Sequence, residues 1–281
     1  MAFHSKHDSL LRKFVPSVAR LSYNPFFKVA GDAIARALAR PFPELRELPP
    51  NHLCIRIGCG NRIFNNQVMF LKAGSDCWLT FLSRKYCTST SDVVELGCGC
   101  GRIARALKEP WFEGTYVGVD IDDEMLAYCR NHFPPERFKF VRSPHKSTTY
   151  SATNSHDDKL TVGHDLLIAE PNSKDFVYAF TLYTHLLERE VTDYLQETYR
   201  ILRPQGIMYL NYLCIEHVEL GGRYTFQHRR GNAYVESVRY PEAAVAYHEA
   251  FMTGLATSCG FRDVTATPPH GAGQTEFVGR K

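Results

Sequence analysis

The chain lacks the long apolar runs that would place it in a membrane. No run approaches the roughly 20 residues that a bilayer-spanning helix needs. The start of the chain, MAFHSK, has no apolar segment of the kind that directs secretion, so we expect a cytoplasmic protein. An excess of charge of one sign is also missing, because the net charge is only +3 over 281 residues. This near-neutral balance gives no reason to predict a nucleic-acid partner.

The nine cysteines show none of the spacings that mark a metal site. There is no C-x-x-C pair and no matching histidine pair, which are the patterns typical of structural zinc. An odd number of cysteines in a chain without a secretion signal fits free thiols in a reducing compartment. We therefore expect small buried side chains, with no metal site and no disulfide framework.

One segment stands out, Asp92-Val-Val-Glu-Leu-Gly-Cys-Gly-Cys-Gly-Arg102. Its apolar start predicts a central strand of a parallel sheet, and its three alternate glycines predict a sharp turn that a ligand can approach closely. Helix-forming residues follow from Arg102 to Leu107. A second apolar run, 116–121, contains Asp120, nineteen positions after Gly101. A carboxylate at the end of the next strand can accept both hydroxyls of a ribose, so these elements predict a site for an adenosine-bearing cofactor.

Which cofactor binds there is a separate question. Gly99-Cys-Gly-Arg-Ile-Ala104 also fits the relaxed dinucleotide pattern G-x-G-x-x-A, so an NAD-dependent oxidoreductase stays open. The preceding Glu95-Leu-Gly97 is not required by that pattern, and no paired Tyr and Lys proton donor is evident. A binding module that kept the fold without turnover is a further alternative.

The sequence Glu95-Leu-Gly-Cys-Gly-Cys-Gly101 resembles the first motif of the class I S-adenosylmethionine-dependent methyltransferases, and Val117-Gly-Val-Asp-Ile-Asp122 resembles their second. Tyr199-Arg-Ile-Leu-Arg-Pro-Gln-Gly206 is similar to their turn before the fifth strand, with Gln205 in place of the usual first glycine. The resemblance implies S-adenosylmethionine as the cofactor and assigns these contacts: the loop of Gly97, Cys98, Gly99 and Gly101 to the methionine part, Asp120 to the ribose, Ile121 or Met125 to the adenine, and Glu95 to the cofactor directly or through the loop amides. Many relatives have an acid after the third strand, where this chain has Arg142 and Ser143, so Ser143 or a backbone amide would replace that contact.

Alternating apolar patterns predict an α/β protein, and the resemblance implies a Rossmann-like fold of this class. We expect a mostly parallel, seven-stranded central sheet with helices on both faces, occupying residues 86–281. Residues 1–85 would form an N-terminal helical extension or lid, and residues 142–174 an irregular insertion. The expected helices are 26–40, 75–86, 101–108, 122–132, 187–202 and 242–259. The expected strands are 92–96, 115–120, 137–141, 175–180, 206–214, 261–266 and 274–279.

Methyl transfer to a hydroxyl needs a base, and a histidine suits neutral pH. The best placed is His185, because the segment from Phe180 to Leu186 leaves the carboxyl end of the fourth expected strand, where Phe180 would also meet the cofactor. This segment resembles the S-x-F-T-H-L segment of a bacterial subgroup found beside sugar and natural-product biosynthesis enzymes. A structural role for His185 stays open, and His217 is a second candidate base.

Two tyrosines, Tyr150 and Tyr183, are candidates to line an acceptor pocket. The preferred hypothesis is O-methylation of a polar small molecule such as a sugar or natural product. A homodimer stays open as the oligomeric state. N-methylation of a small molecule is an alternative.

Overall fold

The computed structural model describes residues 22–57, 66–145, 167–218, 224–269 and 273–281. The chain divides into two compact units, Met1–Trp78 and Leu79–Lys281, and the boundary falls inside one helix, α6 (Asn66–Ser83).

In the described part of the first unit, three helices precede α6: α3 (Pro25–Ala39), α4 (Pro43–Arg46) and α5 (Asn51–Arg56). The side chain of Asn24 caps α3 by accepting hydrogen bonds from the amides of Phe26 and Phe27, and Pro25 occupies the first turn, where no amide donor is needed. Asp32 of α3 accepts from the backbone amide of His52 and lies 2.6 Å from the Nδ1 atom of its ring. These buried contacts join α3 to α5.

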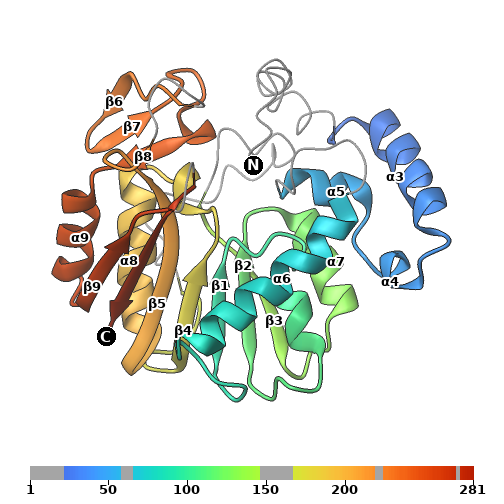
Figure 1. Cartoon of the computed structure of the whole chain (residues 1–281), viewed down its shortest axis with the longest axis horizontal. Coiled ribbons are helices and arrows are strands. Elements are labelled where there is room, and N and C mark those ends of the chain that lie inside the picture. The colour runs from blue at the N-terminus through green and yellow to red at the C-terminus, as the bar shows by residue number, and fades with distance from the viewer. Residues whose placement is uncertain (1–21, 58–65, 146–166, 219–223, 270–272) are drawn as a thin grey trace, which may run out of the picture. The chain divides into compact units, whose positions relative to one another are not determined.

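The second unit is built on the strands of one sheet, whose neighbours run β3-β2-β1-β4-β5, followed on one side by β10 and β9 (Figure 1). These seven strands have the following bounds: β1 (Val93–Leu96), β2 (Tyr116–Asp120), β3 (Phe138–Arg142), β4 (Lys174–Ala179), β5 (Leu202–Cys214), β9 (Arg262–Thr267) and β10 (Thr275–Arg280). The pairs from β3 to β5 are parallel, whereas β10 pairs antiparallel with β5 and β9. The expected fold class, a Rossmann-like α/β fold with a mostly parallel seven-stranded centre, is therefore confirmed.

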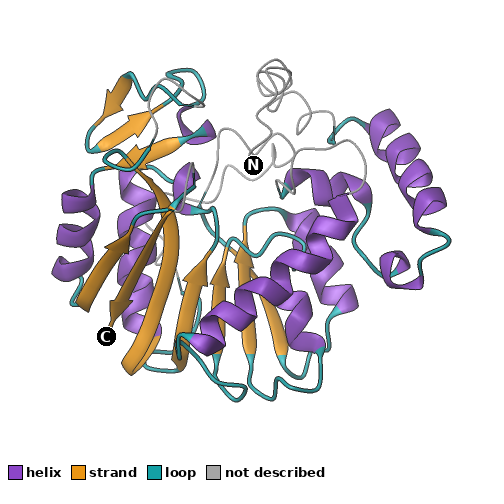
Figure 2. Ribbon diagram, in the orientation of Figure 1, coloured by secondary structure: helices purple, strands orange, loops and turns teal. Residues whose placement is uncertain are grey.

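The described sheet has ten strands because β5 continues past its neighbours. Ala179, the last residue of β4, pairs with Leu210, and β5 runs on to Cys214. This overhang pairs with β8 (Val245–Tyr247), which joins β7 (Ala233–Val235) and β6 (His228–Arg230). Figure 2 shows these short strands beyond the end of β5.

The second unit contains α7 (Asp123–His132), α8 (Glu188–Ile201) and α9 (Glu249–Ser258), of which α7 and α8 follow the sequence pattern closely. Asp122 caps α7 by accepting from the amides of Glu124 and Met125. The apolar stripe of α8 is buried, and its residues join the side chains of β1, β2, β4 and β5 in the main core. No described helix is both long and apolar enough to cross a membrane.

Two expected helices differ in the structure. The segment 101–108 forms only a short 3₁₀ helix, η1 (Ala104–Lys108), after a turn through the last glycine. The segment 242–259 begins with η3 (Pro241–Ala243) and β8, so its α-helix starts only at Glu249. The residues of β8 leave the helical pattern because they pair with Leu213 and Cys214 of the β5 overhang on one side and with β7 on the other.

Candidate functional site

The glycine loop after β1 adopts backbone conformations that side chains resist. Gly97, Gly99 and Gly101 have φ values of 76°, 52° and 80°. A Cβ atom on Gly101 would lie 2.6 Å from the ring of Phe133, and one on Gly97 would lie 3.2 Å from Leu182. The loop is therefore fixed by its backbone and by close neighbours, among them Leu182, which follows β4.

Asp120 ends β2 beside this loop. Its Oδ2 accepts a hydrogen bond of 2.7 Å from the amide of Gly99, and its Oδ1 accepts one of 3.0 Å from the amide of Asp122. Burial raises the pKa of this carboxyl, whereas the bonds from Asp122 and Gly99 oppose that shift. Each carboxylate oxygen keeps a second lone pair, so the side chain can still accept two ribose hydroxyls.

Glu95 lies two residues before the loop and is buried within the sheet. Its Oε2 accepts hydrogen bonds from the hydroxyls of Tyr116 on β2 (2.6 Å) and Tyr178 on β4 (2.9 Å). Burial raises the pKa of Glu95 to about 7, although both tyrosines oppose the shift. The loop amides of Gly97 and Cys98 donate to the carbonyl of Val119, and not to Glu95. Glu95 therefore has no contact with these two amides, and its role toward the cofactor, directly or through the loop amides, stays a prediction.

The thiol of Cys98 points into the core. Its Sγ atom would lie 2.9 Å from a Cβ atom on Gly118 of β2, and burial raises its pKa well above the ordinary value. The thiol of Cys129 on α7 lies 3.6 Å from the carbonyl of Gly99. The cysteines around the loop therefore pack, as the sequence predicted, so any contact of Cys98 with cofactor would involve its backbone.

The three residues assigned to the adenine lie around the end of β2 and the start of α7. Met125 is buried in the first turn of α7, Ile121 is partly exposed, and Ser143 is buried after β3. The backbone amide of Ser143 donates to the carbonyl of Asp120 (2.8 Å), and its hydroxyl lies 2.8 Å from the hydroxyl of Tyr194 on α8. The structure thus brings these residues to one corner of the sheet, with the Ser143 hydroxyl already bonded inside the protein.

The segment leaving β4 contains a non-glycine residue in a left-handed conformation, Thr181, with φ of 58°. The side chain of Asn211 on β5 accepts a 2.6 Å hydrogen bond from the Thr181 amide. Phe180 packs with the rings of Phe81 and Tyr209, at centroid distances of 5.8 and 5.4 Å. Tyr183 is fully buried in the main core, a packing position, and Tyr150 lies outside the described residues.

The two candidate bases lie in different surroundings. His185 is partly buried in η2 (Tyr183–His185), and its Nδ1 lies 2.8 Å from the carbonyl oxygen of Glu242. A carbonyl can only accept, so Nδ1 carries a proton, and in the neutral ring the lone pair is on Nε2. His217 lies after β5, with Nδ1 2.9 Å from the hydroxyl of Thr275 and Nε2 3.8 Å from the carboxylate of Glu249. Only His185 belongs to the segment that contacts the glycine loop through Leu182.

Four side chains that hydrogen-bond to residues of the site were not predicted from the sequence: Tyr116, Tyr178, Tyr194 and Asn211. Three of them read as ordinary aromatic core residues. Asn211 gave a usable signal, because it is a lone polar residue inside the apolar run from Ile207 to Leu213. A polar residue in a buried strand needs a partner, and here the partner is a backbone amide at the edge of the site.

An α/β sheet with a glycine loop after its first strand and a carboxylate at the end of its second defines a nucleoside-cofactor domain. A family profile described as "Methyltransferase domain" matches residues 94–210, less than half of the chain. Over these residues the chain is therefore similar to a methyltransferase domain.

The chain is also similar to individual proteins over part of its length. The chain is 29% identical over 121 residues to the N-terminal Xaa-Pro-Lys N-methyltransferase 1 of Ailuropoda melanoleuca, an alignment covering 43% of this chain and 47% of that protein. The chain spans less than half the length of the curated relatives it matches first. Among solved structures, S-adenosylmethionine-dependent methyltransferases of Methanosarcina mazei and Mesorhizobium loti both align with TM-score 0.48 and 16% identity. They cover 71% and 75% of this chain, and 96% and 99% of their own chains.

Proposed function

We propose that the protein as a whole transfers the methyl group of S-adenosylmethionine to a hydroxyl oxygen of a polar small molecule, such as a sugar or a natural product. The observation that carries the proposal is the pairing of Asp120 with the glycine loop. The carboxylate is held by the amides of Gly99 and Asp122 and keeps lone pairs for a ribose. The family match over residues 94–210 supports the same cofactor.

In this proposal the bound cofactor supplies an already activated methyl group, so the protein mainly aligns the acceptor. The glycine loop would hold the methionine part, Asp120 the ribose, and Ile121 and Met125 the adenine. His185 would take the proton of the acceptor hydroxyl. Its Nδ1–H is fixed by the Glu242 carbonyl, which in the neutral ring leaves the lone pair on Nε2, the form that a general base requires.

Cofactor binding is tested by isothermal titration with S-adenosylmethionine and its demethylated product. We expect the wild type to bind both and Asp120→Ala to lose on the order of 100-fold in affinity, because two hydrogen bonds to a charged group disappear. Asp123→Ala is the matched control. This exposed acid lies three positions after Asp120 and pairs with Arg142 at 3.0 Å. Absence of binding by the wild type would overturn the proposal, and equal affinity in Asp120→Ala would overturn the role of that residue.

The acceptor is tested with a panel of sugars, phenols and other hydroxyl compounds, with transfer followed by mass spectrometry. His185→Gln should lower kcat by at least about 100-fold and leave cofactor affinity unchanged, since it removes a base without touching the cofactor site. It should also remove the acidic limb of the pH–rate profile. A merely structural role for His185 would leave that limb in place.

A second candidate is N-methylation, which is favoured by one observation: the matched relative of Ailuropoda melanoleuca is an N-methyltransferase. Amines in the same panel separate the two, because an amine acceptor reacts when deprotonated and needs no histidine base. Methylation of amines alone, unaffected by His185→Gln, would replace the hydroxyl proposal.

A rise in melting temperature with NAD, and none with S-adenosylmethionine, would favour an oxidoreductase.

A further inference from the structure

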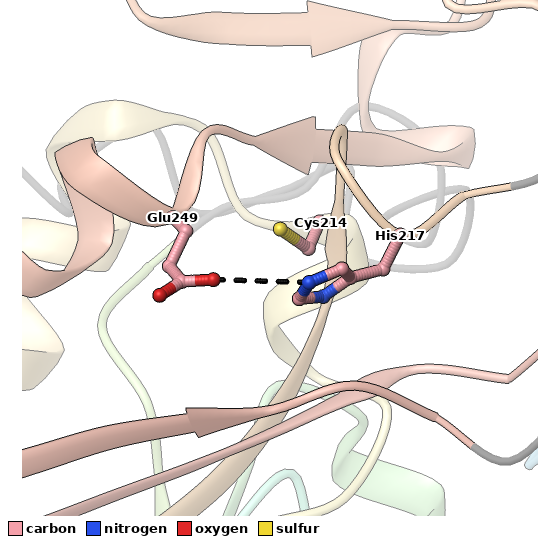
Figure 3. A group of neighbouring side chains, drawn as sticks. All are labelled: Cys214, His217 and Glu249. Carbon is pink, nitrogen blue, oxygen red and sulfur yellow. Dashed lines mark ion pairs between the residues drawn. The ribbon is translucent and has the colours of Figure 1, made fainter.

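A group of three side chains with metal-ligand chemistry lies at the far end of the β5 overhang. Cys214 is the last residue of β5, His217 follows in the next turn, and Glu249 begins α9 (Figure 3). One ligand atom of each lies within 4.8 Å of the others, and His217 Nε2 is 3.8 Å from a Glu249 oxygen. The cysteine and histidine are three positions apart, and β8 brings the start of α9 to them because it pairs with β5.

The ring of His217 is oriented by a contact on its other side. Its Nδ1 lies 2.9 Å from the hydroxyl of Thr275, a buried residue of β10 that pairs with Tyr212 of β5. If Nδ1 donates to this hydroxyl, Nε2 presents its lone pair to Cys214 and Glu249. Metal-bound histidines in proteins are usually fixed in this way, through a hydrogen bond from the ring nitrogen that does not bind the metal.

A second observation at the same place is the hydroxyl of Tyr212. It is buried, and the thiol of Cys214 is the side chain that hydrogen-bonds to it, with Glu216 and Glu249 acting on it by charge. Sulfur is a weak hydrogen-bond partner, so a ligand or water at this place would improve the hydrogen bonding of a hydroxyl that faces the group of three.

We propose that Cys214, His217 and Glu249 bind one zinc ion. Mixed sulfur, nitrogen and oxygen donors suit zinc, whereas magnesium and calcium prefer oxygen alone. A tetrahedral ion with bonds of roughly 2.0–2.3 Å needs its ligand atoms somewhat closer together than they lie here. The Glu249 side chain is 44% exposed and has room to move inward. Water takes the fourth position and bonds to the Tyr212 hydroxyl.

The ion would fasten the first turn of α9 to the place where β5 already pairs with β10. It would tie the end of β5 to the first turn of α9, and through His217 and Thr275 to β10. Glu216, whose Oε2 lies 2.9 Å from the Cys214 sulfur and whose Oε1 lies 2.8 Å from His248 Nδ1, adds negative charge beside the ion. The thiol loses its proton on binding, so zinc affinity should increase with pH.

The test uses the full chain without an affinity tag, stripped with a chelator and titrated with zinc chloride. We expect one zinc per chain, a rise in melting temperature, and, with cobalt(II) in its place, near-ultraviolet absorption from a thiolate–cobalt bond. Cys214→Ser should abolish that absorption and weaken zinc binding more than about 100-fold, and Thr275→Val should weaken it roughly 10- to 100-fold. Cys259→Ser, at the other end of α9, is the matched control and should change neither.

Glu249→Gln keeps the test decisive if Cys214→Ser fails to fold, because the side chain is half exposed and helical. Loss of zinc affinity in Glu249→Gln supports the site. Wild-type protein that binds no zinc, or binds it equally well in Glu249→Gln, overturns it. Cofactor titration on the same samples is separate, so failure of the zinc site leaves the proposed methyl transfer untouched.

Discussion

The carboxyl ends of two neighbouring parallel strands solve one backbone problem in different ways. After β1 the chain turns through Gly97, Gly99 and Gly101, which all have positive φ, and none of them has a Cβ atom to strain. After β4 the positive φ of 58° belongs to Thr181, a β-branched residue for which this conformation is a genuine outlier. There the side chain of Asn211 accepts from the Thr181 amide, and the Thr184 hydroxyl donates to the Thr181 carbonyl.

The difference shows what fixes the backbone conformation at each strand end. The loop after β1 has glycine at each position of positive φ, so its turn carries no side-chain strain, although the Asp120 carboxylate also accepts from the Gly99 amide. The segment after β4 holds a conformation that costs on the order of 1–3 kcal/mol and persists only because its surroundings fix it. Strained residues of this kind cluster at functional sites, and this segment carries His185, the proposed base.

The largest expected effect comes from giving the glycine end a side chain. Gly101→Ala should lower the free energy of unfolding by about 3 kcal/mol, because φ of 80° strains alanine and its Cβ would lie 2.6 Å from the Phe133 ring. Urea unfolding measures the loss. Gly254→Ala is the control, since this helical glycine of α9 has nothing within 4 Å of an added Cβ and should become more stable by up to ~1 kcal/mol. Equal effects at the two glycines would contradict the strain argument.

The second prediction uses pH to separate the ends, because only the glycine end has a buried carboxyl on its strand, whereas the other end has the neutral Asn211. The pKa of Glu95 is raised from 4.5 to about 7 by burial, so the folded state binds its proton more tightly than the unfolded state. This group's stabilising contribution is complete below pH 4.5 and is lost as the pH rises through 7, amounting to about 3 kcal/mol.

Glu95→Gln cannot titrate, so its stability relative to wild type should rise by about that amount between pH 4.5 and pH 8. Urea unfolding at both pH values measures the difference. The exposed Glu113→Gln serves as the control and should follow the wild type. A stability difference that is the same at both pH values would show that Glu95 does not titrate in this range.

The contrast between the ends also explains how much could be predicted from the sequence. Glycine, the acid at Asp120 and the helix cap at Asp122 act through residue type and local spacing, so the pattern predicted the fold class, β1, β2 and α7. The positive φ of Thr181, the η1 turn and the start of β8 depend on partners distant in sequence. Asn211 is 30 positions from Thr181, and β8 became a strand only because β5 overhangs its neighbours. No local pattern reports such pairings.

The third prediction removes the clamp at the β4 end. Asn211→Ala should lower the free energy of unfolding by about 1–2 kcal/mol, because the Thr181 amide loses its acceptor at a partly buried position. Asn211→Asp keeps an acceptor oxygen and should retain most of the stability. Thermal unfolding of the two variants side by side makes the measurement. If both lose stability equally, the amide group and not its acceptor oxygen would be what matters.

The smallest expected effect comes from Thr181→Gly, which would place glycine at the positive φ of both strand ends. Thr181→Gly removes the strain of a positive φ, which costs on the order of 1–3 kcal/mol, but adds roughly 0.5–1 kcal/mol of backbone entropy to the unfolded state. The net expectation is a stabilisation of about 1 kcal/mol, seen as a higher melting temperature. The gain should persist in the Asn211→Ala background, since glycine holds this conformation without a clamp. A lower melting temperature for Thr181→Gly would mean that the threonine side chain contributes more by packing than its backbone costs, and the two ends would then differ in packing and not in strain.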